Sequence, residues 1–546
     1  MCKKLAITIS GAVSLGSYEA GVLYELLSAL RQHNSHPETP EEEKVYIDVI
    51  TGASAGGMTA AIAVHKLLYE EGALADPYEN AFYQAWVAEI DIERLFHFHG
   101  HDAPTMSVLS SQTIVDISQK LVTDRYSGSG KRSISKHAAV DVNNLSLGLA
   151  LANLNGIDYS LKVSPAGSLT YTRHKDEFIL SFPAAERPAS DNRDIWDKVC
   201  AAAVSCGAVP FAFRVVDLLR DASELGLQDQ VKTPSSELKF AYTDGGTFQN
   251  EPISLAKRLV DKIDKHRNLE QRFFLFVAPD LKASAANTVF NAKNAHFSSM
   301  AKRLFGAIFN QARFPDLLLA EEKNIEVGVL DDMATGLAKR LQKSDGRAIA
   351  HSLTSVAEPL LDALFPSKQE IEVARDRLRH QFADTYRGLD SEVKDAWIDA
   401  ILTFERAAGL GETDEMTIYS IIAADKELAG ADLFAFAGFF DRSYREHDYE
   451  VGREKAQAFL TSKGILGLPN GLRWTPAPSR GKDASLSGLK LRDMDRGVRE
   501  RVRNQLLDRS SDILKKFGIN WFMVGPVIRF IINLRIKRHL EKLLEL

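Results

Sequence analysis

The sequence predicts an α/β fold, a three-layer α/β/α domain followed by a mostly helical C-terminal half. Strand-like and helix-like segments alternate along the chain up to about Pro279, as they do in layered α/β proteins. After Leu281 the apolar residues follow long helical periodicity instead. At 546 residues, 45% of them hydrophobic, the chain is long enough to bury more than one ordinary core.

The first predicted unit is a strand, a glycine-containing loop and a helix. Residues 4–9 form an apolar run, and residues 10–16 (Ser-Gly-Ala-Val-Ser-Leu-Gly) separate it from a helical pattern that extends from about Ser17 to Arg31. The loop has neither the G-K-S/T end of a Walker loop nor the G-x-G-x-x-G pattern, so nucleotide binding is not expected. Its backbone N–H groups are better suited to an oxyanion hole.

The second unit is a G-x-S-x-G turn centred on Ser54. An apolar strand at residues 46–51 precedes it, and a helical pattern over residues 57–69 follows. A serine on such a tight strand-to-helix turn is exposed to substrate, and the small neighbours let the strand and the helix pass closely. The helix N-terminus also favours negative charge on a substrate oxygen. The pattern therefore predicts a nucleophile elbow.

Later segments complete the predicted sheet. Strand-like runs cover Val142–Ala150, Glu177–Phe182, Leu238–Thr243 and Phe273–Ala278. The third of these runs leads into Asp244 and two glycines, and the sequence Asn250-Glu251-Pro252 follows shortly after. An aspartate followed by two glycines is usually only a turn.

In this order, the three segments resemble the patatin-like phospholipase family, over roughly the first 280 residues. The small residues and proline of residues 203–213 are also similar to that family. The resemblance implies a Ser–Asp dyad, with Ser54 as the nucleophile and Asp244 as the general base. It further implies an oxyanion hole at Gly11, Ala12 and Val13, and structural roles for the motif glycines Gly52, Gly56, Gly245 and Gly246.

The oxyanion loop departs from the family pattern D/S-G-G-G-x-R/K-G. Ala12 and Val13 occupy the second and third glycine positions, and Leu15 occupies the basic position. Backbone N–H groups do not require a particular side chain, so Ala12 and Val13 are still expected to donate. Any role of the basic residue is lost.

The predicted function is that of a lipid acyl hydrolase, cleaving carboxyl esters of glycerophospholipids or related lipids through a Ser54 acyl-enzyme. Asp244 has to accept a proton without an intervening histidine, which requires burial to raise its pKa. Two alternatives stay open. One is a Ser/His/Asp triad esterase using His266 or His296, and the other is a catalytically silent, membrane-associated scaffold.

Four parts are expected along the chain: a catalytic domain at 1–282, a helical extension at 283–475, a linker at 476–488 and a C-terminal helical segment at 489–546. Helical patterns in the second half cover Phe297–Phe309, Met333–Gln342, Glu370–Tyr386 and Glu392–Arg406. In residues 436–449, aromatic and paired charged residues predict a buried anchor with an ion-pair network joining the lobes, with a substrate-contact role as the alternative.

Composition limits the partners. A net charge of −6 argues against nucleic acid, and three irregularly spaced cysteines indicate a reducing, cytoplasmic compartment. The short apolar run at the N-terminus does not predict a cleaved signal peptide. No cofactor is expected. Three histidines and Asp102 lie within residues 97–102, but no remote cluster matches them, so no metal is predicted.

The segment 515–540 combines apolar and basic residues without any acidic one before Glu541, a composition typical of an interfacial membrane helix. The Gly525-Pro526 break and Arg529 argue against a span. Peripheral membrane contact through this segment is therefore expected, with a helix docked on the core as the alternative.

Overall fold

A computed structural model describes most of the chain. The described residues are 2–103, 105–122, 136–141, 143–164, 167–183, 192–225, 237–264, 271–279, 300, 303–304, 306–308, 311–313, 315–343, 345–407, 416–424, 426–516, 536–538 and 540–546. Two compact units emerge from them: unit 1 comprises residues 1–260, 271–316 and 418–546, and unit 2 comprises residues 261–270 and 317–417. The four expected parts stay a prediction.

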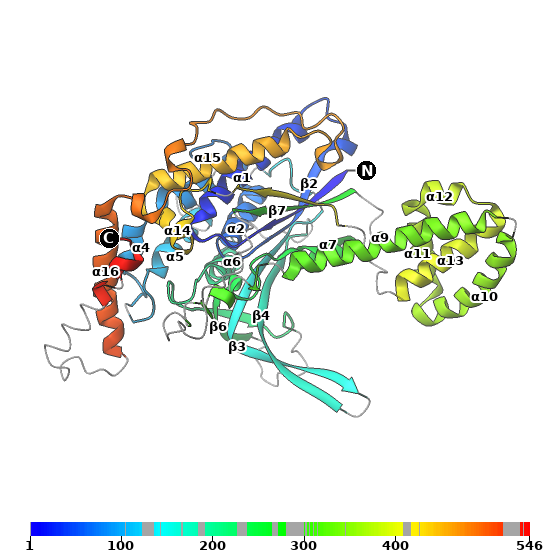
Figure 1. Cartoon of the computed structure of the whole chain (residues 1–546), viewed down its shortest axis with the longest axis horizontal. Helices are drawn as coiled ribbons and strands as arrows, with labels where there is room; N and C mark the ends of the chain where they lie inside the picture. The colour runs from blue at the N-terminus through cyan, green and yellow to red at the C-terminus, as the bar shows by residue number, and fades with distance from the viewer. Residues whose placement is uncertain are drawn as a thin grey trace. The chain divides into compact units, whose positions relative to one another are not determined.

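Unit 1 is built on a mixed eight-stranded sheet with helices packed against it (Figure 1). Its strands are β1 (Lys3–Ile9), β2 (Val45–Gly52), β3 (Ser146–Ser164), β4 (Gly167–Ser181), β5 (Val216–Asp221), β6 (Glu237–Asp244), β7 (Gln271–Ala278) and β8 (Ile418–Ile422). The strand order is β5-β6-β3-β2-β1-β7-β8, and β4 pairs with β3 outside this path. Strands β3, β2, β1, β7 and β8 are parallel, whereas β4, β5 and β6 make antiparallel pairs. The predicted α/β/α class is confirmed.

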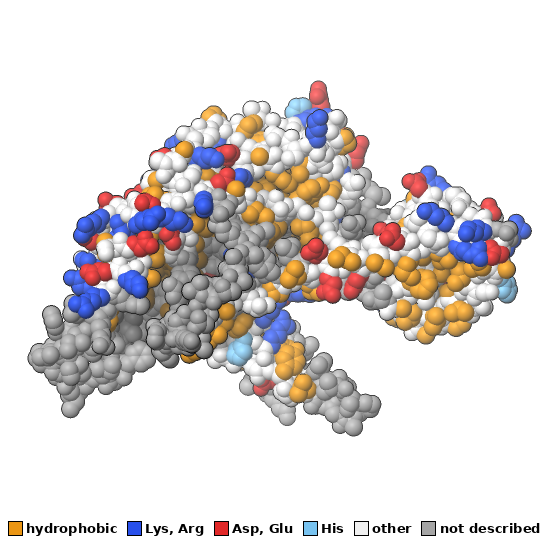
Figure 2. Space-filling model, in the orientation of Figure 1, with side chains coloured by type: hydrophobic (Ala, Val, Ile, Leu, Met, Phe, Trp, Pro, Cys, Tyr) orange, Lys and Arg blue, Asp and Glu red, His pale blue; other side chains and the backbone are white. Residues whose placement is uncertain are grey.

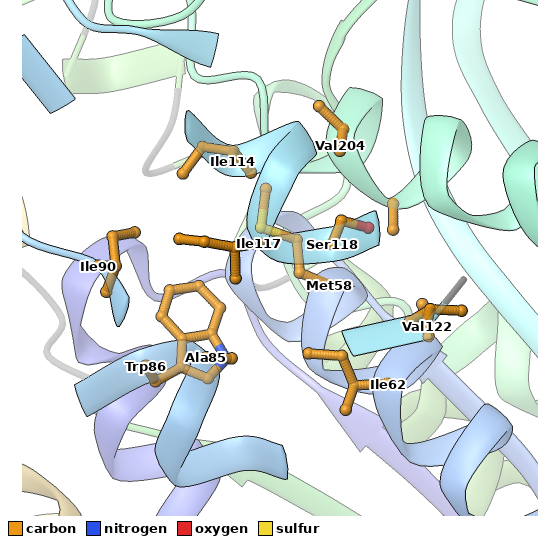
Figure 3. A pocket seen from close by; sticks show the side chains of 12 residues that line it. Met58, Ile62, Ala85, Trp86, Ile90, Ile114, Ile117, Ser118, Val122 and Val204 are labelled. Atoms are coloured by element: carbon orange, nitrogen blue, oxygen red, sulfur yellow. The ribbon is translucent and has the colours of Figure 1, made fainter. Parts of the chain in front are cut away.

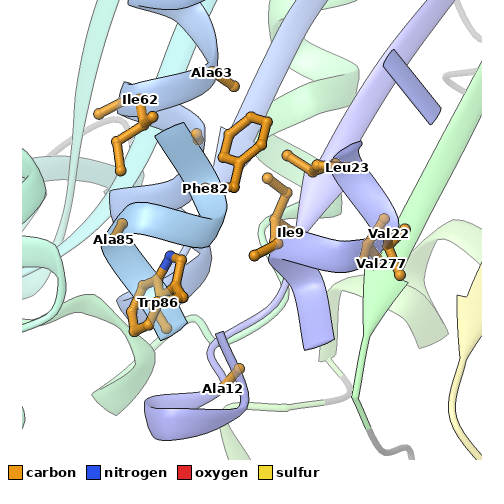
Figure 4. Close-up of a cluster of buried hydrophobic side chains, with 14 of the residues drawn as sticks. Ile9, Ala12, Val22, Leu23, Ile62, Ala63, Phe82, Ala85, Trp86 and Val277 are labelled. Carbon is orange, nitrogen blue, oxygen red and sulfur yellow. The ribbon is translucent and has the colours of Figure 1, made fainter. Parts of the chain in front are cut away.

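The helices of unit 1 occupy both halves of the chain. They are α1 (Gly16–Ser35), α2 (Ser54–Tyr69), α3 (Ala81–Tyr83), α4 (Ile92–Phe96), α5 (Ser111–Val122), α6 (Arg193–Cys206), α7 (Ile253–Asp264, whose last residues belong to unit 2), α14 (Asp432–Ala435), α15 (Arg442–Leu460) and α16 (Arg496–Lys516). Residues from β1, α1, α2, β7 and the segment 81–86 share one buried core, shown in Figure 4.

Strand β3 is longer than the sequence predicted. The predicted strand stopped at Ala150, whereas β3 continues to Ser164 and pairs with β4 as a long hairpin, interrupted by an irregularity between Ala152 and Ile157. Several side chains on this hairpin are polar or exposed, so the apolar pattern stops where the burial stops. Pairing with a neighbouring strand, and not an apolar run, maintains the extended backbone there.

Helices α1 and α15 lie side by side (Figure 1). A side chain at Gly21 would meet the Tyr449 carbonyl, and one at Gly452 would meet the Tyr18 carbonyl, so glycine is needed at both positions. The pair is joined by Arg453, which is 1% exposed and donates to Glu25 Oε1 at 2.7 Å. This buried pair ties α15 to the first helix but lies outside the predicted segment 436–449, within which Arg442 pairs with Glu446 at 2.9 Å in a half-exposed position.

Unit 2 is helical, as predicted for the second half of the chain. Helix α9 (Pro315–Leu341) enters it, and α10 (Gly346–Leu364), α11 (Lys368–Gln381), α12 (Ala383–Arg387) and α13 (Ser391–Ala407) complete it. Trp397 is fully buried in its core and donates from Nε1 to the Ala334 carbonyl at 2.9 Å. Figure 2 shows hydrophobic side chains gathered on one face of this unit. The exposed large hydrophobic residues of unit 2 as a whole include Leu318, Ile325, Val329, Val356, Leu360 and Val373.

The predicted membrane segment lies largely outside the described residues, since residues 517–535 are among those not described. Among the helices that are described, none combines the length and the apolar character needed to cross a bilayer. Most of the predicted helix Phe297–Phe309 also falls outside the described part of the chain.

Candidate active site

The pairing of the strands places the three predicted site segments at neighbouring positions along the sheet. Ile9 at the end of β1 pairs with Gly52 at the end of β2, and Gly52 pairs with Leu149 of β3. Two residues further along β3, Leu151 pairs with Asp244 at the end of β6. The loop after β1, the elbow after β2 and the turn after β6 therefore leave the sheet close together.

Ser54 occupies a strained turn between β2 and α2. It is the first residue of α2, its φ is +50°, and it is 5% exposed. A left-handed backbone is unusual for serine and persists only where the surrounding structure fixes it. Here the Ala53 N–H donates to the Ile9 carbonyl at 3.2 Å, and Gly56 lies so close to the Ile9 and Ser10 carbonyls that no side chain fits. The elbow geometry expected from the sequence is present.

Asp244 faces Ser54 directly. The Ser54 hydroxyl donates to Asp244 Oδ2 at 2.6 Å, and the Gly246 N–H donates to Oδ1 at 2.7 Å. Burial raises the pKa of Asp244 from 3.8 to about 7, although both hydrogen bonds favour the ionised form. A carboxyl group with this pKa is about half ionised at neutral pH and is a stronger base than an ordinary aspartate.

Contacts with main-chain carbonyl groups fix the position of Asp244. The Ala208 carbonyl, just beyond α6, accepts from the Asp244 N–H at 3.0 Å and from the Thr243 hydroxyl at 2.7 Å. Gly245 approaches the Ala150 carbonyl too closely for a side chain. Ala208 lies within the small-residue stretch that was predicted only as a family feature, and a carbonyl contact leaves no mark on side-chain type.

The glycine-containing loop supplies two unoccupied donors. The Gly11 N–H donates to the Asn250 carbonyl at 3.0 Å, so this predicted donor is already engaged. Within the described residues, the N–H groups of Ala12 and Val13 have no acceptor. Val13 has a φ of +53°, and a side chain at Gly11 would meet Asn250 and the Cβ of Ser54. The loop thus passes directly over the serine.

Asn250 holds this loop from the far side. Its side-chain Nδ2 donates to the Gly11 carbonyl at 3.3 Å, and its own N–H donates to the Ala312 carbonyl at 3.0 Å. Together with its carbonyl, Asn250 therefore contacts both main-chain polar groups of Gly11. Its place six residues after Asp244 was the only signal of this contact in the sequence.

The N-terminal part of the chain is similar to a known protein family. A sequence model of the family described as Patatin-like phospholipase matches residues 7–257. This part of the chain is a patatin-like phospholipase domain. The match ends inside α7, and most of the helical half lies beyond it.

A relative in Sinorhizobium fredii, named uncharacterized protein y4iI, is 25% identical over 395 residues. The aligned part makes up 58% of this chain and 55% of that protein, so the chain spans about half the length of this curated relative.

An apolar pocket in the patatin-like domain begins one helical turn after Ser54. Figure 3 shows Met58 and Ile62 of α2 facing Ile114 and Ile117 of α5 across it, with Trp86 closing one side. Its cavity volume is only about 40 Å³, and every lining residue except Ser118 is apolar. Side chains of this kind offer apolar contacts to a hydrocarbon chain, although the cavity is too small to enclose one.

The histidine-rich segment is a set of loop contacts. Asp102 accepts from the Ser110 hydroxyl, the Gln112 N–H and Arg214 Nε at 2.6, 2.7 and 2.9 Å. His99 pairs with Asp116 at 2.7 Å. Among the described residues, no group of three or more histidine, cysteine or acidic side chains is arranged to hold a metal. The triad candidates His266 and His296 lie outside the described residues.

Proposed function

We propose that the protein hydrolyses carboxyl esters of glycerophospholipids or related lipids through an acyl-enzyme on Ser54. The observation that carries this proposal is the 2.6 Å hydrogen bond from the Ser54 hydroxyl to Asp244, together with the pKa of about 7 that burial gives this carboxyl. A base with a pKa near the working pH is the most effective proton acceptor.

In the first half-reaction, Ser54 Oγ attacks the ester carbonyl carbon while Asp244 accepts the hydroxyl proton. The N–H groups of Ala12 and Val13 are the proposed donors to the resulting oxyanion, because the Gly11 N–H is already bonded to Asn250. The tetrahedral intermediate then collapses, and the proton on Asp244 passes to the departing alcohol. The acyl group stays on Ser54.

In the second half-reaction, water attacks the acyl carbon. Asp244 accepts a proton from that water, the carbon–oxygen bond to Ser54 breaks, and Ser54 recovers its proton as the fatty acid leaves. No cofactor or metal is required by these steps. Both half-reactions form a tetrahedral oxyanion, so both depend on the donors of the same loop. Loss of one such donor typically slows a step of this kind by roughly 10²- to 10³-fold.

The pocket beside Met58 supports a lipid over a small ester. An acyl chain in contact with these side chains would remove apolar surface from water. Peripheral membrane contact through residues 515–540 stays a prediction. A truncation before Lys515, assayed on a soluble ester and on anionic liposomes, tests it: selective loss on liposomes supports contact, and loss of both activities with stability contradicts it.

The test of the proposed function is digestion of a mixed glycerophospholipid preparation, with mass-spectrometric detection of free fatty acids and lysolipids. Wild-type protein should release both, and Ser54→Ala should release neither. Release by both proteins would contradict the proposal. Activity that survives in Asp244→Asn and disappears in a His266 or His296 variant would favour the triad alternative. Lipid binding without any release would favour the scaffold.

A further inference from the structure

Unusual backbone conformations meet next to the oxyanion loop. Val13 has a φ of +53°, and in the C-terminal part of unit 1, Leu433 and Ala435 have φ values of +52° and +65°. Branched and other non-glycine residues persist in this region only where their surroundings hold them there. Val13 stands where the resembled family pattern has a glycine, which adopts such a φ at no steric cost.

Ser14 connects these strained segments. Its side chain is fully buried, and its hydroxyl donates to the Ala435 carbonyl and accepts from the Gly438 N–H at 3.1 Å. Ser14 occupies the variable position of the loop pattern, so no role follows for it from the family resemblance. Its two partners lie more than 400 residues away in sequence and outside the matched range 7–257.

The segment that receives Ser14 is itself fixed by α15. Asp448, fully buried, accepts from the N–H groups of Ala429 and Gly430 at 2.7 and 3.0 Å. Arg445 donates to the Gly438 carbonyl at 3.0 Å and to the Phe439 carbonyl at 3.2 Å. Gly438 packs closely against Ser14, because a Cβ atom at Gly438 would lie 2.5 Å from Ser14 Oγ.

The other side of the loop offers less restraint on Val13. Ala12 is 4% exposed and lies in the core with Ile9 and Trp86 (Figure 4). Val13 is only partly buried, and its N–H has no acceptor among the described residues. Val13, whose backbone conformation is strained, is therefore the direct sequence neighbour of Ser14, whose side chain is held by two hydrogen bonds.

We propose that Ser14 is a positioning residue, and that Ser14 with residues 435–438 forms a clamp that keeps Val13 left-handed so that its N–H points at the oxyanion. The inference rests on the proposed function and adds a residue to it. Without the clamp, Val13 relaxes to a negative φ and its N–H turns away. Transition-state stabilisation is then lost while substrate binding is kept.

The decisive experiment measures Ser14→Ala in two backgrounds, wild type and Val13→Gly. In the wild-type background, kcat should fall by about tenfold or more while KM changes less than about twofold. In the Val13→Gly background the same substitution should lower kcat by less than about threefold, because glycine holds the required φ without a clamp. Equal losses in both backgrounds, or no loss in either, would overturn the inference.

A variant on the opposite side of the clamp gives a second measurement. Gly438→Ala should reproduce the fall in kcat, since its methyl group displaces the Ser14 hydroxyl. Ser28→Ala is the matched control. Like Ser14, Ser28 is buried, but it lies on α1 away from the loop, so this variant should keep the wild-type kcat.

Hydrogen exchange of the amides in residues 11–16 provides a readout that does not depend on turnover. Ser14→Ala should exchange faster than wild type and than Ser28→Ala, and equal rates would overturn the clamp. Failure of the proposed function looks different: Ser54→Ala would then retain wild-type hydrolysis. If Ser54→Ala is inactive and Ser14→Ala is fully active, the clamp is contradicted and the proposed function stands.

Discussion

The two turns that carry the candidate site are constructed differently. The elbow at Ser54 is fixed by its immediate neighbours in the sheet, through the Ile9 carbonyl and the close approach of Gly56. The oxyanion loop has lost two of the family's glycines and is fixed by distant residues, Asn250 and the segment 435–438. The position of the Ser54 hydroxyl thus depends on nearby strands of the sheet, whereas the position of the oxyanion-loop N–H groups depends on residues far away in the sequence.

The largest expected effect is at the elbow. Ser54→Ala should lower turnover by roughly 10⁴-fold or more, because no other hydroxyl replaces the nucleophile. Alanine fits the tight turn, so the free energy of unfolding should change by less than about 1 kcal/mol. Lipid assays and thermal unfolding check both statements, with Ser205→Ala, a buried serine of α6, as the control that keeps turnover. Appreciable hydrolysis by Ser54→Ala would remove the elbow from the mechanism.

The second effect concerns Asp244 and pH. Turnover requires ionised Asp244, so kcat should fall as the pH drops below about 7 and level off above it. The neighbouring Cys206 thiol does not titrate in this range, because burial and Asp244 raise its pKa well above the usual value. Asp244→Asn should be nearly inactive at every pH. Asp448→Asn is the control, because Asp448 also has a pKa of about 7 but does not contact Ser54. In this variant the midpoint of the pH dependence of kcat should not change.

Stability should move in the opposite direction from activity. A carboxyl whose folded pKa is raised to about 7 binds more protons in the folded state between about pH 4 and 7, so stability falls as the pH rises through this window. The shift from 3.8 to about 7 corresponds to about 4 kcal/mol at most. Asp244→Asn should therefore unfold at a higher temperature than wild type at pH 8, with the difference shrinking toward pH 4. A difference independent of pH would contradict the burial argument.

The third effect tests the distant support of the loop. Asn250→Ala removes the donor to the Gly11 carbonyl while keeping the main-chain bonds, so kcat should fall by about tenfold and KM should stay nearly constant. Asn34→Ala is a comparison variant, because Asn34 makes similar side-chain bonds to main-chain groups far from the loop. Its loss should lower stability without the selective fall in kcat. A change confined to KM in Asn250→Ala would make Asn250 a substrate contact.

The smallest effect belongs to the apolar pocket. Ala203→Phe should narrow the space between α2 and α6 and shift the preferred acyl chain to shorter lengths, by several-fold in the ratio of kcat/KM values. Hydrolysis of a series of esters from four to sixteen carbons measures it. An unchanged preference would place the acyl chain elsewhere.

The sequence predicted the fold class, the elbow and the position of Asp244 because strand-to-helix turns with obligatory small residues leave visible patterns. It did not reveal the Ala208 carbonyl or the bond from Gly11 to Asn250, since main-chain contacts place no demand on side-chain type. It also predicted three oxyanion donors, whereas two of these N–H groups, those of Ala12 and Val13, have no acceptor among the residues that the structure describes. It did not reveal the two partners of Ser14, because they lie 421 and 424 residues away in the sequence.

The most direct test of the central claim is covalent labelling with a fluorophosphonate, followed by peptide mass spectrometry. The account predicts one adduct, on Ser54, formed at a rate that rises with pH around 7, strongly slowed in Asp244→Asn and absent in Ser54→Ala. An adduct on another residue, or equal labelling of wild type and Ser54→Ala, would contradict it.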